Sequence, residues 1–472
     1  MPHKLRTRRL SWCKGRTSQG LSTRYRVSHP GWTRLPIILR CLVSLIALLA
    51  SASVARSAVD PSGDREGNVL AVSCTKFLSS LGVVTFVDQG YDASAYAGPL
   101  RYLGVHNIRD GERHLAATLK LHQETGVLVD LGGPDVKGML VAARELAAAG
   151  ALLSLEGPNE PNNSPVEYEG KRGGGAGDWL PVARLQIDLY KAVKQDPVLR
   201  RYPVFDVSEG GAETNNVGMQ FLIIPKGEGT LMPDGTEFAD YANLHNYVIG
   251  NCRRYQDNQA WQAADPTLNS CWDGMFVEYG RTWKRGYIGY SRENLQTLPR
   301  VTTETGWDSV ADPGGENVQG KILVNTYLAQ FIRGWRYTFI YELKDGEGGS
   351  GHQGLFRENW TPKPAANYIH NLTSILADGS PVLAPKELGF TMSGARETVH
   401  DLLLEKSAGT FDLVVWGEQV KSTSKVTIHF DKVHSDVRLY DVTQDPEPVQ
   451  KLVNVTDVPL LVSDHALIVE IR

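Results

Sequence analysis

The chain has 472 residues, of which 42% are hydrophobic and 22% are charged. This balance is typical of a folded globular protein and excludes a collagen, a coiled coil and a chain that is disordered throughout. The formal net charge is −4, but residues 1–58 hold 11 Lys and Arg and no Asp or Glu, which leaves 38 basic and 53 acidic residues in the remainder. An acidic body repels a phosphate backbone, so we expect no nucleic-acid partner.

A basic segment opens the chain and is followed by the apolar run CLVSLIALLA at residues 41–50 and then by small residues. This order is typical of a secretory signal, and a helix of ten residues spans only about 15 Å of a bilayer core about 30 Å thick. We therefore predict that residues 1–58 are a leader removed on export to a bacterial periplasm or exterior, leaving a protein with no membrane attachment. The alternatives are a membrane anchor, a start downstream of Met1 and a twin-arginine signal at Arg8 and Arg9.

From residue 82 onwards, strand patterns and helix patterns alternate. Eight strand-then-helix units indicate a (β/α)8 TIM barrel over residues 82–385. A doubly wound open sheet shows the same alternation, but no G-x-G-x-x-G motif follows the first strand. The predicted strands are 82–88, 106–110, 127–131, 151–156, 203–208, 241–248, 300–304 and 337–343. Helix ranges are predicted for every unit except the fifth and sixth, namely 99–103, 112–124, 135–149, 179–195, 317–334 and 362–377.

Residues 386–472 have a different pattern, in which short strands are separated by turn residues. This spacing indicates a C-terminal β-sandwich domain. The segment before the barrel, residues 59–81, could add a strand to that sandwich. The predicted strands of the tail are 412–416, 425–430, 437–440 and 466–471.

Three of the five cysteines follow the leader. Cys252 and Cys271 bracket a polar segment and could form a disulfide in an oxidising compartment, which leaves Cys74 over. No Cys spacing matches a zinc site, so we expect no metal and no other cofactor.

Two glutamates stand where predicted strands end. Glu160 follows the fourth strand in the run SLEGPNEPN, and Glu304 closes the seventh strand in the run VTTETGW. In a barrel both places lie at the carboxyl-terminal mouth, where active sites are found. A facing pair of carboxyl groups suits glycoside hydrolysis, because one protonates the leaving oxygen while the other attacks the anomeric carbon. Asn159, next to Glu160, can hydrogen-bond a sugar hydroxyl.

The Asn-Glu-Pro sequence after the fourth strand and the Glu at the end of the seventh resemble clan A of the glycoside hydrolases, the 4/7 superfamily. Within the clan, the run Asn-Glu-Pro-Asn and the β-sandwich tail are similar to the family 39 group of β-xylosidases and exopolysaccharide hydrolases. Families 5, 30, 51 and 79 are the alternatives. The resemblance covers residues 82–378 by strand order and rests on short motifs.

The resemblance implies a role for each matching residue. Glu160 would be the acid/base and Glu304 the nucleophile of a retaining double displacement, and Asn159 would contact the sugar 2-hydroxyl. His245 and Tyr247, on the sixth strand, match a His or Tyr that the clan places beside the nucleophile. Arg109, on the second strand, matches a buried Arg that holds the nucleophile ionised.

The sequence departs from the clan pattern at two places. The eighth strand ends in Tyr341-Glu342-Leu343, where the clan commonly has a Trp that forms the floor of the sugar site. We expect Trp307 or Tyr341 to take that place and Glu342 to bind sugar hydroxyls. Gly157-Pro158 also stands where a Trp often precedes Asn-Glu-Pro.

These observations predict a secreted retaining glycoside hydrolase whose partner is a poly- or oligosaccharide. The alternatives are a carbohydrate-binding protein without catalysis and a transglycosylase that uses the same two glutamates. The sugar, its linkage and the oligomeric state are left open by these motifs.

Overall fold

The computed structural model describes residues 67–161, 163–174, 178–208, 236–248, 255–264, 299–348 and 351–472. The predicted leader, Cys252 and Cys271 lie outside the described residues. Cys74 has a free, buried thiol. Of the helices in the described ranges, none is both long enough and apolar enough to cross a membrane.

Eight parallel strands form a closed barrel, in the order β10-β11-β12-β3-β4-β5-β6-β9. The ring closes between the first and last of these, because Asp206 N donates to Tyr241 O (3.0 Å) and Asp240 N donates to Val204 O (2.8 Å). The predicted TIM barrel is therefore confirmed. In chain order the strands are β3 (Leu81–Val84), β4 (Asn107–Gly111), β5 (Leu128–Gly132), β6 (Leu152–Glu156), β9 (Val204–Phe205), β10 (Ala242–Asn243), β11 (Arg300–Thr305) and β12 (Trp335–Ile340).

Strands β9 and β10 are shorter than the sequence predicted. Polar side chains beside them take over backbone hydrogen bonds: the Asp206 carboxylate accepts from Val207 N (2.8 Å), and Asn243 Nδ2 donates to Asp206 O (3.3 Å). Side chains of this kind compete with a regular ladder. Beyond β9 the pairing continues only as single bridges, such as that between Asn159 and Ser208.

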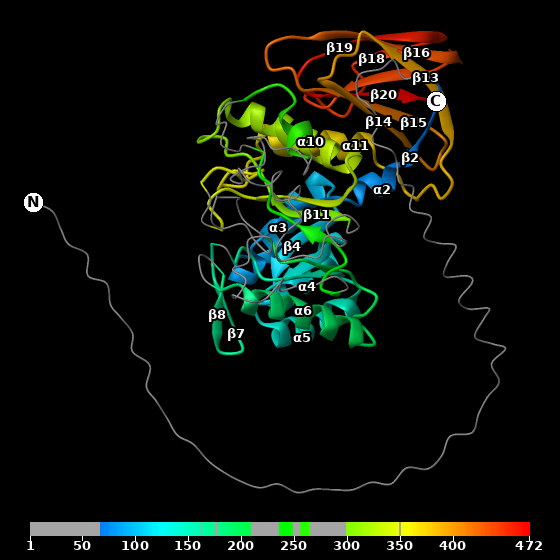
Figure 1. The fold of residues 1–472 in the computed structure, drawn as a ribbon. Coiled ribbons are helices and arrows are strands. Elements are labelled where there is room, and N and C mark those ends of the chain that lie inside the picture. Colours follow the sequence, from blue (N-terminus) through cyan, green and yellow to red (C-terminus); the bar gives the residue numbers. More distant parts are fainter. Residues whose placement is uncertain are drawn as a thin grey trace, which may run out of the picture. The chain divides into compact units, whose positions relative to one another are not determined.

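Helices cover the outside of the barrel (Figure 1). Three of them end at a glycine in the left-handed conformation, namely Gly104, Gly126 and Gly150. Glycine is favoured at this position because it has no Cβ to clash in that conformation. The helix predicted at residues 99–103 begins earlier, at Ala93, because Asp92 caps it by accepting from Ser94 N (3.0 Å). Pro99 lies within this helix. The helices are α2 (Cys74–Leu78), α3 (Ala93–Leu103), α4 (Leu115–Thr125), α5 (Val136–Ala149), α6 (Leu180–Gln195), α7 (Gln259–Ala263), α10 (Gly315–Ile332) and α11 (Pro364–Ile375), with a 3₁₀ turn η2 (Val87–Gln89).

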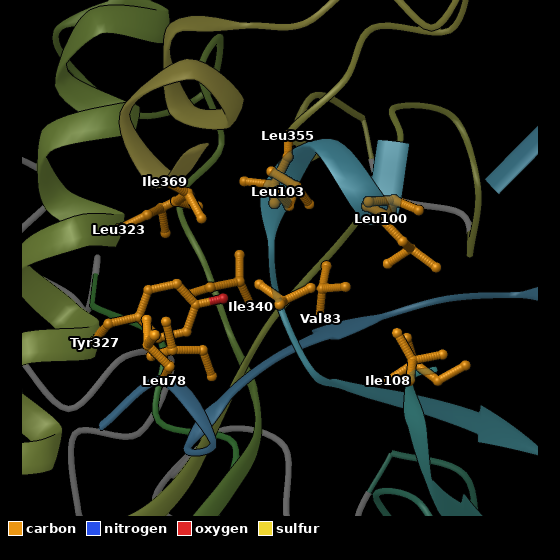
Figure 2. Close-up of a cluster of buried hydrophobic side chains, with 14 of the residues drawn as sticks. Leu78, Val83, Leu100, Leu103, Ile108, Leu323, Tyr327, Ile340, Leu355 and Ile369 are labelled. Carbon is orange, nitrogen blue, oxygen red and sulfur yellow. The ribbon is translucent and has the colours of Figure 1, made fainter. Parts of the chain in front are cut away.

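The barrel has apolar layers on both sides of its strands, as parallel sheets require. Figure 2 shows the outer layer, where Val83 and Ile340 of the strands pack against Leu323 and Ile369 of the helices. In the inner layer, a Cβ on residue 82 would lie 2.4 Å from the ring of Phe339, so only glycine fits there. The inner layer consists of Val84, Leu153, Phe205, Val301, Tyr337 and Phe339.

Two sheets, antiparallel in all but one strand pair, form the C-terminal sandwich, with a core that includes Phe390 and Ile428 from one sheet and Leu413 and Val469 from the other. The segment before the barrel takes part in both, because β1 (Asn68–Leu70) pairs with β13 and β2 (Val72–Ser73) pairs with β14. The first sheet has the order β1, β13 (Glu387–Ser393), β16 (Ser424–His434) and β19 (Val455–Val462). The second has the order β18 (Gln450–Leu452), β17 (Val437–Asp441), β20 (Ala466–Ile471), β15 (Phe411–Gly417), β14 (Val399–Glu405) and β2.

Helices α10 and α11 lie between the barrel strands and the sandwich (Figure 1). Lys321 Nζ, on α10, contacts the Asp464 carboxylate of the sandwich at 2.9 Å. The Glu418 carboxylate, at the end of β15, accepts hydrogen bonds from the backbone N–H groups of Ala260 (2.9 Å) and Trp261 (3.0 Å) at the start of α7. The sandwich therefore caps a helix in the connection that follows the sixth barrel strand.

We expect Glu418→Ala to lower the free energy of unfolding by about 1–3 kcal/mol, because two buried backbone donors lose their acceptor. Burial raises the pKa of Glu418 from 4.5 to about 7, against the opposing effect of those donors. The folded state therefore binds more protons than the unfolded state between these pH values, and the contribution of Glu418 to stability falls as pH rises through this window.

Urea unfolding at several pH values checks both points. Glu418→Gln keeps an acceptor for the two N–H groups and removes the titrating carboxyl group, so it separates the capping effect from the pH dependence. Exposed Glu397→Gln is the control, and an unchanged stability in Glu418→Ala would contradict the capping role.

Candidate active site

Glu160 lies four residues beyond the end of β6, on a segment bound to the neighbouring strand. Its backbone N–H donates to Ser208 O (3.0 Å), and its carbonyl accepts from Asn163 N (2.9 Å) and Ser164 N (2.7 Å). Its φ of +41° is in the left-handed region, which costs a residue with a side chain about 1 kcal/mol or more. Strain of this kind persists only where the surroundings hold the backbone in place. The Glu160 carboxyl group is therefore presented in a fixed direction.

Glycine is required where the chain leaves β6. A Cβ on Gly157 would lie 2.0 Å from Gln186 Oε1 and 2.9 Å from Val207 N. Gln186 is itself fixed, because its Nε2 donates to Phe205 O (3.2 Å) and Phe238 O (2.8 Å). This close packing leaves no room for a side chain at residue 157.

Glu304 lies on β11 and is held by two donors. Arg109, on β4, donates from a terminal nitrogen to Glu304 Oε1 (2.6 Å), and the Tyr247 hydroxyl donates to Glu304 Oε2 (2.9 Å). Burial lowers the pKa of Arg109 by itself, but the Glu156 and Glu304 carboxylates outweigh it and keep the guanidinium charged. Burial and the Glu304 carboxylate also raise the pKa of Tyr247, which stays a hydroxyl donor.

His245 connects the two glutamates. Its Nδ1 lies 2.8 Å from Glu160 Oε1 and 3.4 Å from Glu304 Oε2, and the residue is completely buried. One oxygen of each carboxyl group and a ring nitrogen of His245 all lie within 4.8 Å of one another. The barrel therefore brings Glu160 and Glu304, 144 positions apart in the sequence, into one site.

The carboxyl group of Glu160 accepts a second hydrogen bond, from Asn163 Nδ2 to Oε2 (3.0 Å). Burial alone would raise the pKa of Glu160. The hydrogen bonds from His245 and Asn163, together with the charges of His245 and Arg109, outweigh burial and lower this pKa. The site as it stands therefore favours the ionised form of Glu160.

Asn159 is exposed and is oriented by Arg109, which donates to its Oδ1 at 2.7 Å. With the carbonyl turned toward Arg109, the NH2 group of the amide faces the other way, where a ligand hydroxyl could accept from it. The structure thus joins five of the residues predicted from the sequence by hydrogen bonds and one close charged contact, namely Arg109, Asn159, Glu160, His245 and Glu304, with Tyr247 joined through Glu304.

Three other predicted sugar-binding residues lie differently. Trp307 has no exposed surface and packs edge-on against Tyr255 at 6.3 Å between ring centres, so it belongs to the core and cannot stack on a sugar here. Glu342 is also completely buried, which corrects the expectation that it binds sugar hydroxyls. Tyr341 is only partly buried and lies edge-on to Tyr247 at 6.3 Å. Of these three, Tyr341 is the one placed beside the paired carboxyl groups.

The same three groups of Glu160, His245 and Glu304 are close enough to ligate a metal ion. Both Glu304 oxygens already accept hydrogen bonds, and Arg109 places a buried positive charge 2.6 Å from one of them. This charge would repel a metal cation. The arrangement thus suits carboxyl groups that act by themselves.

Several residues of the site were not predicted. Glu156 accepts two hydrogen bonds from Arg109 and one from the Thr303 hydroxyl, and Thr303 also contacts His245 Nε2 at 3.0 Å. A signal was present in the sequence, because a Glu at the end of an otherwise apolar buried strand needs a charged partner. Arg109 on the second strand is the corresponding residue of opposite charge.

The fold is similar to solved structures of glycoside hydrolases. A family 39 glycoside hydrolase from the gut symbiont Bacteroides cellulosilyticus WH2 is 18% identical, with 85% of this chain and 82% of that chain covered and a TM-score of 0.56. A GH30 endoxylanase from Clostridium papyrosolvens C71 is 9% identical, with 86% of this chain and 97% of that chain covered and a TM-score of 0.50. No protein-family model matches the sequence, and no curated protein matches it. The predicted resemblance to the clan A glycoside hydrolases, with family 39 among them, is therefore confirmed for the fold.

Proposed function

We propose that this protein is a retaining glycoside hydrolase in which Glu304 is the nucleophile and Glu160 the acid/base. The observation that carries the proposal is the spacing of the site, where one oxygen of each carboxyl group lies within 4.8 Å of the other and of a ring nitrogen of His245. Retaining enzymes hold the two carboxyl groups about 5–5.5 Å apart, whereas inverting enzymes need about 6.5–9.5 Å to admit a water. The short separation favours direct attack by a carboxylate.

The hydrogen bonds to the two glutamates support different roles for them. Glu304 accepts from Arg109 and Tyr247, which orient it as a nucleophile. In the first step a Glu304 oxygen bonds to the anomeric carbon, the glycosidic bond breaks, and the leaving oxygen takes the proton of Glu160. In the second step Glu160 takes a proton from water, which displaces Glu304 from the sugar.

Glu160 has to be protonated for the first step, so its lowered pKa places the alkaline limb of kcat/KM on the acid side of neutrality. We expect His245→Asn to move this limb to higher pH, because removal of a close donor and its charge leaves burial as the dominant effect on the pKa of Glu160. The measurement is the pH profile of kcat/KM with an aryl glycoside. His352→Asn, a half-exposed histidine, is the control. A limb that stays in place in His245→Asn would show that His245 does not set the ionisation of Glu160.

The substrate we propose is a poly- or oligosaccharide, and we propose that the protein is exported, with the leader of residues 1–58 removed. The orientation of Asn159 by Arg109 supports contact with a sugar hydroxyl near Glu160. The basic segment, the apolar run and the small residues that follow it support export. Expression of the full chain in a bacterial host, followed by N-terminal sequencing of the exported protein, tests the leader.

The activity is tested on a panel of aryl α- and β-glycosides and natural polysaccharides. NMR of the first-formed product gives its anomeric configuration, and retention supports the double displacement, while inversion would contradict it. Activity that persists when Glu160 and Glu304 are both replaced would exclude this site as the catalytic one. Binding without hydrolysis would favour a carbohydrate-binding protein instead.

A further inference from the structure

A pair of buried carboxyl groups lies behind the site on two adjacent barrel strands. Asp130 on β5 and Glu156 on β6 have no exposed surface. Glu156 accepts from Arg109 at both of its oxygens, from Nε (2.8 Å) and from a terminal nitrogen (2.9 Å), and from the Thr303 hydroxyl (3.0 Å). Asp130 Oδ1 accepts from the Ser154 hydroxyl at 2.7 Å.

The two carboxyl groups favour different ionisation states. Among the described residues, no donor reaches Asp130 Oδ2, although this atom is buried. Burial and the Glu156 charge raise the pKa of Asp130 well above its ordinary value. Burial also acts to raise the pKa of Glu156, but Arg109 outweighs it and this pKa is lowered. Asp130 is therefore the protonated partner, which can donate to Glu156, and Glu156 carries the charge.

Arg109 is consequently divided between two carboxylates. It directs Nε and one terminal nitrogen to Glu156, and the other terminal nitrogen to Glu304. We propose that Glu156 is a positioning residue for Glu304, which acts by fixing the Arg109 guanidinium and by sharing its charge. This inference rests on the proposed function of Glu304 as the nucleophile.

The double displacement explains why Arg109 would need a second carboxylate besides Glu304. When Glu304 bonds to the anomeric carbon it becomes an ester and loses its negative charge. A buried guanidinium left without a counter-ion is costly. Glu156 keeps its charge throughout, so Arg109 stays paired and in place while the ester exists, and Glu304 returns to the same contact when water releases it.

The charged groups that act on Glu156 come from two elements, Arg109 from β4 and His245 from the segment after β10, and both favour its ionised form. Asp130, on β5, favours the same form of Glu156. Glu304, on β11, and Glu160, after β6, are held by the same Arg109 and His245. The nearest change that removes the Glu156 charge and keeps its size is Glu156→Gln.

We expect Glu156→Gln to lower kcat by about 10- to 100-fold, the effect known for removing a partner that orients a metal-binding side chain. Arg109 would then act on Glu304 alone. An opposite charge favours the ionised carboxylate and a competing carboxylate opposes it, so the acidic limb of kcat/KM moves to lower pH. A purely structural role for Glu156 would reduce activity without moving this limb.

A second measurement needs no substrate. The ¹⁵N–¹H signal of Arg109 Nε, assigned by its loss in Arg109→Lys, should be shifted and slow to exchange in the unmodified protein because Glu156 accepts this hydrogen. In Glu156→Gln the amide presents an N–H to one of the Arg109 donors, so the signal should move and exchange faster. Circular dichroism and urea unfolding confirm that the variant is folded.

Two further variants serve as controls for Glu156→Gln. Glu405→Gln removes a buried carboxylate in the sandwich and should leave kcat and the acidic limb unchanged. Asp130→Asn keeps a donor to Glu156 and removes no charge if Asp130 is protonated, so its acidic limb should stay in place. A shift would contradict the protonated state of Asp130. A folded Glu156→Gln with unchanged kcat, acidic limb and Arg109 signal would overturn the proposal. If the unmodified protein hydrolyses no glycoside, the proposed function fails, and the Arg109 signal still decides whether Glu156 fixes the guanidinium.

Discussion

Replacing Glu304 by alanine should lower kcat for an aryl glycoside by about 10⁴-fold or more, the loss expected when the nucleophile of a covalent mechanism is removed. The side chain is nearly buried, and it is the acceptor of both Arg109 and Tyr247. Without it the carboxylate that would form the glycosyl ester is gone, and Arg109 and Tyr247 each lose one acceptor. The measurement is the rate of release of the aryl alcohol at the pH optimum. The control is Glu316→Ala on the outer helix α10, which removes a carboxylate that pairs with Arg357.

An added nucleophile should restore turnover to Glu304→Ala and report the geometry. Azide can enter the space left by the carboxylate and attack the anomeric carbon from the same side, while Glu160 still protonates the leaving group. The product is then a glycosyl azide of inverted configuration, which NMR identifies. Wild-type turnover in Glu304→Ala, or an azide product of retained configuration, would contradict the assignment of Glu304 as nucleophile.

The sequence predicted the barrel because its repeat is strong in the apolar pattern. Six of the barrel strands are regular and lie close to their predicted ranges, and the helices between them mostly end at glycines that are visible in the sequence. Once the strands are numbered, the barrel geometry alone brings residues at the ends of the fourth and seventh strands to the same mouth. Glu160 and Glu304 could therefore be paired without any knowledge of side-chain contacts.

The differences between the predicted and the observed structure have equally local causes. Strand β14 is buried on every residue and lacks the alternation by which a half-exposed strand is recognised, so it was not predicted. Trp307 follows β11 at a place where a side chain can turn either to the mouth or to the core, and packing against Tyr255 decides for the core. The pattern of a sequence reports on burial averaged along an element, whereas the direction of one side chain after a strand depends on distant neighbours.

The network behind the site was hidden for a related reason. Asp130 and Glu156 lie in strands that otherwise read as buried, and each charged residue in such a strand implies a partner. The identity of that partner depends on the register between adjacent strands, which places Arg109 opposite Asp130 and within reach of Glu156. Register is set by the closed barrel as a whole, so only the structure shows that one guanidinium serves two carboxylates.

Replacing Glu160 by alanine should have an effect that depends on the leaving group. With a natural disaccharide or an unactivated glycoside, the loss of general acid assistance should lower kcat/KM by about 10²- to 10⁴-fold. A dinitrophenyl glycoside needs no proton on its leaving oxygen, so its first step should remain close to that of the unmodified protein. Its second step loses the base that activates water, so a burst of dinitrophenol should be followed by slow turnover.

Azide separates the two glutamates by the configuration of its product. In Glu160→Ala the ester on Glu304 still forms, and azide attacks it from the side that Glu160 occupied, so the glycosyl azide should have retained configuration and turnover should recover. The same reagent gives the inverted azide in Glu304→Ala, because there it replaces the nucleophile itself. Asn163→Ala, which removes only one hydrogen bond to Glu160, should not produce a burst and serves as the matched variant. If the two azide products are exchanged between the variants, the roles of Glu160 and Glu304 are exchanged as well, and the contacts of Arg109 and Tyr247 would then orient the acid/base instead of the nucleophile.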